Sequence, residues 1–149
     1  MRILFLGDVV GNSGCSKIVE SLADQIKLKK IDFVIVNAEN AAEAGVGLTK
    51  EICEDFFNCG VNVITTGNHV WDQKEIMNFI DKEKRLLRPK NLFEPAPGNG
   101  FGIYKTKDDI KIGVLNLMGN VFMKKCDDVF QASKKFIEKY KLKEDYDLL

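Results

Sequence analysis

The chain has 149 residues, of which 45% are hydrophobic and 30% are charged, and its 22 basic residues balance its 22 acidic ones. Such a composition is typical of a globular protein, so we expect residues 1–149 to form one domain around a single core. Without a net charge the chain lacks the global field that attracts DNA or an anionic membrane, and it carries no signal for either partner. Any bound anion must therefore be held by a local site.

The cellular location is predicted from what the sequence lacks. No apolar run approaches the ~20 residues of a membrane span, and the opening MRILFLGDVV has neither the apolar length nor the cleavage site of a signal peptide. The four cysteines, Cys15, Cys53, Cys59 and Cys126, form no CxxC pair and no zinc-like spacing, which fits free thiols in a reducing compartment. We therefore expect a cytoplasmic protein without disulfides.

Three strand–helix units are predicted in succession along the first eighty residues. Apolar, β-prone strands are expected at residues 2–6, 32–36 and 62–65. Helices are expected at about residues 15–29, from an N-cap at Thr49 to near Gly60, and at about residues 72–80. Continuous apolar strands separated by helices indicate a parallel sheet that is covered on both faces. The predicted fold class is therefore α/β.

The pattern changes in the second half of the chain. The stretch 85–100 contains all three prolines and is expected to be a long ordered loop without a regular element. Residues 102–106 and 110–117 read as a β-hairpin with two aspartates in its turn, Asp108 and Asp109, and residues 129–142 read as one amphipathic helix. The final EDYDLL places an aspartate before apolar residues after a basic helix end, as KKIDFVIV does, so it reads as the beginning of a further strand.

Polar side chains follow each of the first three predicted strands. Asp8 follows the first strand, Glu39 and Asn40 follow the second, and Asn68 and His69 follow the third. In an open α/β sheet ligands bind beyond the carboxyl ends of the strands, so we expect these side chains to converge there. Oxygen ligands with an added imidazole suit Mg, Mn, Fe or Zn, and a carboxylate can bridge two ions ~3.5–4 Å apart.

Each of these residues also has an ordinary structural interpretation. Asp8 is a suitable cap for a helix or turn, Glu39 and Asn40 suit a solvated loop, and a lone histidine such as His69 is more often structural than catalytic. Their coincidence at three strand ends favours a site. The glycines of segment 7–14 fit neither GxGxxG nor the Walker pattern, so a dinucleotide or P-loop site is weakly supported.

Five motifs carry a resemblance that runs in order across essentially the whole chain. GDVVG, VNAENAA with the later GVGLT, TTGNHVWD, RLLRPKN and NLMGNVFM resemble the successive motifs of the YmdB-like branch of the metallophosphoesterases, within the calcineurin-like phosphodiesterase superfamily. The resemblance implies a four-layer α/β/β/α sandwich with a dinuclear metal centre. The two divalent ions are expected to be iron or manganese, with magnesium or zinc as alternatives.

The resemblance also implies a role for each matching residue. It makes Asp8, Glu39, Asn40 and Asn68 metal ligands, with Glu39 as the bridge between the two ions and Asn68 on the second ion. It makes the adjacent His69 the proton donor or transition-state stabiliser. The implied activity is hydrolysis of a small phosphodiester or nucleotide, with cyclic nucleotides, the 2′,3′-cyclic ones among them, as expected substrates.

One departure from the family pattern limits these expectations. The family completes its metal centre with three histidines from its C-terminal half, whereas His69 is the single histidine here. The chain is therefore interpreted as the N-terminal portion of the domain or as a natural truncation, with the fold incomplete at the C-terminus. Two rival functions stay open, a non-catalytic binding or regulatory module and a nucleotide-binding α/β domain without hydrolysis. The sequence does not decide whether the protein is a homo-oligomer.

Overall fold

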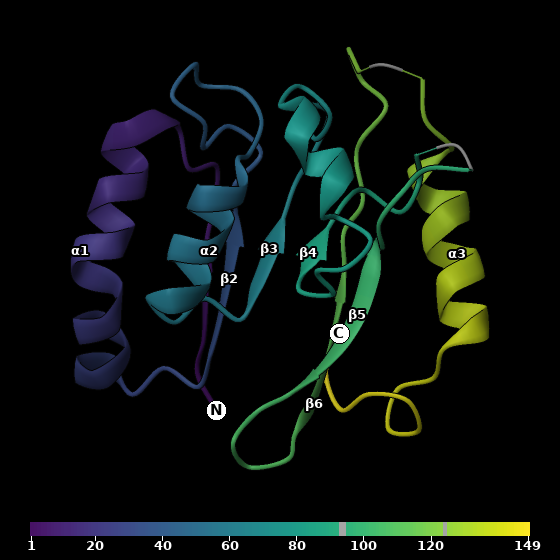
Figure 1. The fold of residues 1–149 in the computed structure, drawn as a ribbon. Helices are drawn as coiled ribbons and strands as arrows, with labels where there is room; N and C mark the ends of the chain where they lie inside the picture. Colours follow the sequence, from purple (N-terminus) through teal and green to yellow (C-terminus); the bar gives the residue numbers. More distant parts are fainter. Residues whose placement is uncertain (93–94, 124) are drawn as a thin grey trace.

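A four-stranded parallel sheet in the order β1-β2-β3-β4 organises the N-terminal part of the chain. The computed structural model describes residues 1–92, 95–123 and 125–149. The strands are β1 (Ile3–Leu6), β2 (Phe33–Asn37), β3 (Val63–Thr65) and β4 (Leu86–Leu87). Because all four strands run in the same direction, their carboxyl ends meet at one edge, the upper edge of the sheet in Figure 1.

Two helices, α1 (Gly11–Lys29) and α2 (Lys50–Asn58), lie side by side on one face of this sheet (Figure 1). Alternation along β2 directs Val34 and Val36 toward them, and both valines are buried in the same core as Phe56 of α2. The removal of this apolar surface from water is the main force that holds the helices on the sheet. The α/β class with a parallel sheet is therefore confirmed.

The starts of the two helices illustrate a local and a distant cap. Thr49 is the N-cap of α2, as predicted, and its side-chain oxygen accepts a hydrogen bond from the backbone N–H of Ile52 at 3.3 Å. Helix α1 begins at Gly11 and not near Cys15. Its first N–H is satisfied by the carbonyl of Asn40, 2.9 Å away in the loop after β2, and such a cap leaves no local pattern in the sequence.

The opposite face of the parallel sheet packs on a second, two-stranded sheet. Strands β5 (Phe101–Lys105) and β6 (Lys111–Leu115) form the predicted antiparallel hairpin. The core between the two sheets is built from Phe33, Val63, Leu87, Ile112 and Val114. Alternating residues of β2 and β3 thus serve two cores, one under the helices and one between the sheets.

Helix α3 (Val129–Lys139) lies beside the second sheet, at the right in Figure 1. Its Phe136 packs edge-on against Phe101 of β5, with ring centroids 4.5 Å apart. Where EDYDLL was expected to begin a strand, Leu148 forms a single parallel bridge to Ile112 of β6. Two parts of the predicted fold stay predictions, namely that it is a four-layer sandwich and that it is incomplete at the C-terminus.

The structure corrects two elements. The α-helix expected over residues 72–80 is wrong: this stretch holds turns and a short 3₁₀ helix, η1 (Lys74–Asn78), closed by i to i+3 bonds such as Ile76 N–H to Gln73 O at 3.1 Å. The stretch 85–100 is not devoid of regular structure, since β4 pairs with β3 there. Two buried residues are too few to show a strand period, so only the neighbouring strand reveals β4.

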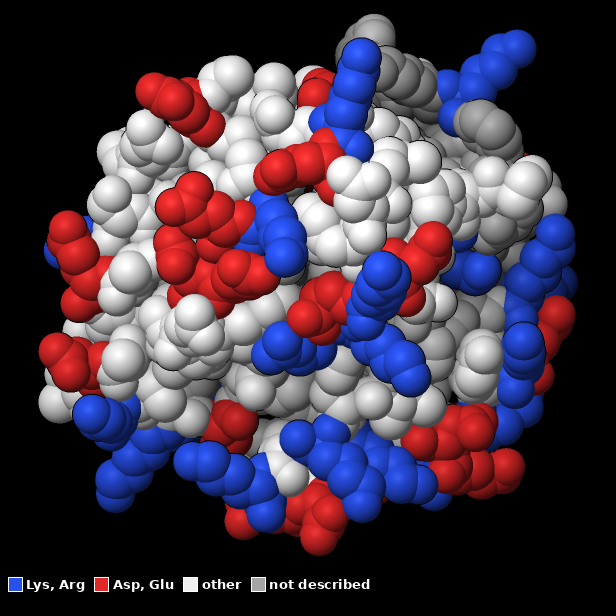
Figure 2. All heavy atoms as spheres, viewed as in Figure 1, with Lys and Arg blue, Asp and Glu red and all other residues white. Residues whose placement is uncertain are grey.

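Three further observations concern the cysteines, the surface and the helices. All four cysteines are free thiols. Lysine and arginine side chains are interspersed with aspartate and glutamate on the face shown in Figure 2, in keeping with the zero net charge. Within the described residues, no helix is both long and apolar enough to cross a membrane.

Candidate metal centre

The loops after β1 and β2 are joined at the carboxyl edge of the sheet. The side-chain amide of Asn40 donates a hydrogen bond to Asp8 Oδ1 at 2.7 Å. Below this contact, the backbone N–H of Val9 donates to the carbonyl of Asn37 at 3.0 Å. Asp8 adopts φ +45°, a left-handed conformation that aspartate tolerates better than most residues and that turns the chain sharply into α1. Asp8 and Asn40 are thereby brought together.

The loops after β2 and β3 meet where Glu39 lies over Gly67. The position of the Glu39 carboxylate is such that a Cβ atom at Gly67 would overlap it. The Glu39 backbone N–H in turn donates to Asn37 Oδ1 at 3.2 Å, which fixes the start of its loop. Glycine is therefore required in the GNH motif because a carboxylate from another strand occupies the space of a side chain.

The electrostatics of this edge favour a bound cation. Burial raises the pKa of the Glu39 carboxyl, the nearby His69 opposes this shift, and the carboxylate of Asp8 adds to it. A half-buried carboxylate beside a second carboxylate is costly in free energy, because burial removes hydration and like charges repel. A divalent ion would offset both costs, so the oxygen donors at this edge fit a metal.

A second set of contacts holds the Glu39 loop against the segment after β3. The carbonyl of Glu39 accepts a hydrogen bond from the backbone N–H of Gly47 at 2.6 Å. Gln73 Nε2 then donates to the carbonyl of Val46 at 3.0 Å, and Gly47, at φ +81°, leaves room for the Gln73 side chain. These bonds close the second loop and tie it to the third, so the donor groups rest on fixed backbone.

The third loop carries Asn68 and His69. His69 Nδ1 lies 2.6 Å from Asp72 Oδ2, and the two side chains are 32% and 33% exposed. Asn68 is half-buried, and within the described part of the chain its side chain makes no hydrogen bond. The structure thus brings Asp8 into a hydrogen bond with Asn40 and seats Glu39 over Gly67. Asn68 lies in the same loop as Gly67, after β3, but does not hydrogen-bond to either carboxylate within the described residues.

The donor set formed by this chain is small. No group of three or more His, Cys, Asp or Glu side chains suited to a metal ion occurs among residues 1–92, 95–123 and 125–149. Two carboxylates, Asp8 and Glu39, with the amides of Asn40 and Asn68, fit part of a metal centre. Carboxylate and amide oxygens alone suit a hard ion, and a nitrogen-preferring ion needs further ligands.

Two buried asparagines of the sequence motifs have a structural role that sequence analysis did not predict, although the sequence suggests Asn91 as a contact for the phosphate or base. Asn116, which follows β6, is buried and donates from Nδ2 to the carbonyls of Thr66 at 2.7 Å and Leu87 at 3.0 Å. It therefore fixes the end of β3 from which the GNH loop departs. Asn91 is also buried and binds the backbone of Met118 through both its oxygen and its nitrogen, at 2.9 and 2.7 Å. Their motifs, NLMGN and RPKN, were the available signal.

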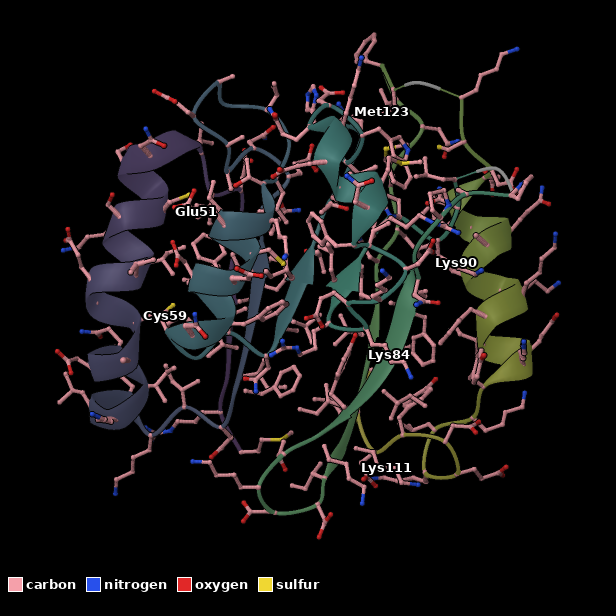
Figure 3. The ribbon with its side chains drawn as sticks, viewed as in Figure 1. Glu51, Cys59, Lys84, Lys90, Lys111 and Met123 are labelled. Atoms are coloured by element: carbon pink, nitrogen blue, oxygen red, sulfur yellow. The ribbon has the colours of Figure 1, made fainter. Side chains whose placement is uncertain are left out.

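The segment after β6 presents an apolar tip at the same upper edge. Val121, Phe122 and Met123 are all exposed, and Figure 3 shows Met123 at the top of the molecule, on the side of the strand carboxyl ends.

The arginine of the RLLRPKN motif, Arg88, is buried. It is only 2% exposed and donates to the carbonyls of Pro89 and Pro97 at 2.9 and 3.0 Å. Its described contacts are therefore structural.

Comparison with known proteins assigns the chain to a family. The model of YmdB-like proteins matches residues 4–149. The chain belongs to the YmdB-like family. It is 43% identical over 138 residues to a Bacillus subtilis (strain 168) protein named 2′,3′-cyclic-nucleotide 2′-phosphodiesterase, a match that covers 92% of this chain and 51% of the relative. The resemblance drawn from the five motifs is confirmed.

Two solved structures agree with this assignment. A hypothetical protein from Thermus thermophilus superposes with a TM-score of 0.87 at 34% identity, over 95% of this chain and 54% of that one. A protein described as a novel phosphatase, from Mycoplasma pneumoniae, superposes with a TM-score of 0.85 at 35% identity, over 95% and 52%. The chain thus spans about half the length of the relatives it matches.

Proposed function

We propose that this chain builds the N-terminal part of the active site of a metal-dependent phosphodiesterase that acts on cyclic nucleotides, the 2′,3′-cyclic ones among them. The observation that carries the proposal is the meeting of the two carboxylates at one sheet edge, Asp8 held by Asn40 and Glu39 seated over Gly67. Membership of a family with phosphodiesterase and phosphatase names among its relatives supports the chemistry.

In this proposal two divalent ions are held by Asp8, Glu39, Asn40 and Asn68. The expected ions are iron or manganese, and magnesium or zinc are the alternatives. When bound, such ions supply Lewis-acid activation of a water molecule and of the phosphoryl oxygens. The protein supplies the negative charge that retains the ions and the rigid loops that orient the donors. The hydrogen bond from Asn40 to Asp8 already holds these two side chains close together, which supports their use as neighbouring ligands.

His69 is the proposed proton donor. Hydrolysis of a phosphodiester breaks the bond from phosphorus to an ester oxygen, and the leaving alkoxide is a poor leaving group until it is protonated. An imidazole beside the phosphate can supply this proton, a contribution of about 10²–10⁴-fold in rate. His69 follows Asn68 on the loop at this edge and is close enough to Glu39 to affect the pKa of that carboxyl, so it is suitably placed.

We expect His69→Ala, in the protein at the full length of its relatives, to lower turnover by about 10²–10⁴-fold without loss of bound metal. Substrates with good leaving groups should lose the least activity, because they need little protonation. Turnover of a series of phosphodiesters that differ in leaving-group pKa, with metal content measured on the same samples, tests this. Equal losses across the series, or loss of metal, would contradict a proton-donor role.

The same preparation separates the rival functions. Asp8→Ala and Glu39→Ala should each abolish metal-dependent turnover if the chain belongs to a phosphodiesterase. A nucleotide-binding domain without hydrolysis would instead retain its nucleotide affinity in both variants and show no turnover in the parent protein. A non-catalytic regulatory module would show no metal-dependent turnover in the parent protein, so Asp8→Ala and Glu39→Ala would change nothing in this assay.

A further inference from the structure

The imidazole of His69 forms a short hydrogen bond with the carboxylate of Asp72. Its Oδ2 lies 2.6 Å from His69 Nδ1, a distance typical of a charge-assisted hydrogen bond. Neither the sequence motifs nor the proposed metal ligands assign a role to Asp72. The sequence pattern predicts Asp72 only as the first residue of an α-helix, and the structure has turns and the short 3₁₀ helix η1 in its place.

The chemistry of the two groups fixes where the proton lies. An ionised carboxylate only accepts hydrogen bonds, so the hydrogen in this contact must be carried by Nδ1 of His69. In a neutral imidazole the other nitrogen, Nε2, is then unprotonated, and in the imidazolium it carries the second proton. Asp72 therefore selects one tautomer and stabilises the charged form, and in both cases Nε2 is left as the nitrogen that can exchange a proton.

The backbone between the two residues holds this geometry. The N–H of Asp72 donates to the carbonyl of His69 at 3.1 Å, which closes a turn and brings the two side chains to the same side. Between them, Val70 is 1% exposed in the main core and Trp71 packs against that core. Adjacent to the turn, Gln73 is tied to Val46. The pair thus rests on a turn anchored at several points.

A second observation places the histidine near the carboxylates of the edge. The Glu39 carboxylate occupies the space above Gly67, which lies two residues before His69 in the loop after β3. The imidazole is therefore contacted by Asp72 on its Nδ1 side and belongs to the loop that Glu39, a candidate metal ligand, covers. An isolated surface ion pair has no reason to combine both features.

We propose that Asp72 is a positioning residue that keeps a proton on Nδ1 of His69, so that the imidazolium gives its other proton, on Nε2, to the leaving group. This inference rests on the proposed function of His69. In the step it supports, water oxygen bonds to phosphorus, the bond from phosphorus to the ester oxygen breaks, and the Nε2 proton passes to that oxygen. The attacking water supplies the proton that restores the imidazolium. Asp72 keeps its charge throughout and does not take up the proton.

The tautomer can be measured on the 149-residue chain itself, at a protein concentration where sedimentation shows a monomer. Because His69 is the single histidine, a long-range ¹H–¹⁵N spectrum contains the signals of one imidazole only. At alkaline pH, where histidine side chains are neutral, we expect a single Nδ1–H form in the parent chain and a mixture of tautomers in Asp72→Ala. Asp72→Glu should restore the Nδ1–H form in part. An unchanged tautomer in Asp72→Ala overturns the proposal.

Glu75→Gln is the matched control. Glu75 lies on η1 three residues further along, and its carboxylate accepts a hydrogen bond from the backbone N–H of Lys50 at 2.7 Å. The substitution weakens a bond of the same segment that is similar in length, 2.7 Å against 2.6 Å, and does not involve the imidazole. We expect the tautomer of His69 to be unchanged in Glu75→Gln, and a tautomer change there would show that loosening the segment is sufficient.

Kinetics on the metal-loaded protein at the full length of its relatives supply the second readout. Asp72→Ala should lower kcat by about 10-fold or more, less than the 10²–10⁴-fold expected for His69→Ala, with KM and bound metal little changed. Because Asp72 acts through His69, the double variant should be no slower than His69→Ala alone. Multiplied losses in the double variant overturn the proposal. A fully active His69→Ala overturns the proposed function of His69, while the tautomer still decides what Asp72 does.

Discussion

At the scale of single residues, Gly67 has the sharpest consequence for the site. A methyl group there must displace the Glu39 carboxylate, yet the backbone at Gly67 does not adopt the left-handed conformation that would itself exclude alanine. We therefore expect Gly67→Ala to fold and to lose about 10–100-fold in Mn²⁺ affinity, measured by calorimetry on the protein at the full length of its relatives.

Gly7→Ala is the control for this substitution. Gly7 lies at the same edge, and a Cβ there would meet only the Phe5 ring, at an ordinary 3.7 Å. The metal affinity of Gly7→Ala should therefore match that of the parent protein of the same length. Equal affinity in Gly67→Ala and Gly7→Ala would mean that Glu39 does not bind the ion.

The pair Glu83 and Arg85 makes a prediction on pH. The side-chain hydrogen bonds from Arg85 hold the pKa of Glu83 below its usual 4.5, although burial opposes this. A depressed pKa in the folded state stabilises the fold above the ordinary glutamate pKa, and this stability is lost as pH falls through the folded value. We expect Glu83→Gln to lower the free energy of unfolding at pH 7 by less than about 1 kcal/mol, since the pair is partly exposed.

The pH profile is the decisive measurement for this pair. Urea unfolding of parent and Glu83→Gln should give curves that differ at neutral pH and converge in acid, once Glu83 of the parent is protonated. Arg85 also lies over the Phe57 ring at 3.7 Å, and this contact persists in the variant. A difference that stays constant into acid would show that the carboxylate charge of Glu83 is not its source.

At the scale of elements, Asn116 joins β6 to the ends of β3 and β4. Its amide donates to two backbone carbonyls, and the side chain is buried. We expect Asn116→Ala to destabilise the fold by about 1–3 kcal/mol, because the carbonyls of Thr66 and Leu87 lose these bonds. Asn120→Ala, at an exposed position beyond the same strand, should cost less in the same urea unfolding measurement. Similar losses for both would refute a special role for Asn116.

The elements that sequence analysis found are those with a local pattern. Strands β1 to β3, the β5–β6 hairpin and the Thr49 cap follow from apolar runs, turn residues and a capping threonine. The elements it missed depend on distant contacts. Strand β4 is defined by its pairing with β3, and the turns before η1 are held by Gln73 against the Glu39 loop.

The same distinction applies to the candidate site. That polar residues after three parallel strands share one edge follows from topology, so the neighbourhood of Asp8, Glu39 and Asn40 could be predicted. The overlap of Glu39 with the space above Gly67, and the bond from His69 to Asp72, depend on side-chain positions that no periodicity records. Such contacts require coordinates.

At the scale of the whole molecule, one apolar groove is open. It has a volume of about 600 Å³ and lies between β1 and β6, where Ile3 and Phe5 are 38% and 59% exposed. Exposed apolar surface of this kind promotes association. We expect the 149-residue chain to bind the dye ANS and to self-associate with concentration, and to hold metal and turn over substrate poorly. Phe5→Lys should weaken dye binding.

The comparison that checks this prediction uses a chain extended to the length of the relatives. Dye fluorescence, sedimentation, bound metal and turnover should be measured on both proteins, purified without chelator. The extended protein should bind less dye and more metal. Equal turnover per chain would show that the donors in residues 1–149 suffice.

The order of the strands has a consequence for how the protein is made. Each strand of the parallel sheet pairs with the one synthesised just before it, so no strand waits for a distant partner. At roughly 5–20 residues per second, the first ninety residues leave the ribosome within seconds, and with them both carboxylates and the imidazole. The nascent chain can therefore bring Asp8 and Glu39 together before the second sheet is made. If the proposed metal centre exists, an ion that binds during translation would relieve the repulsion of the two carboxylates, and we expect ion supply to affect the yield of folded protein.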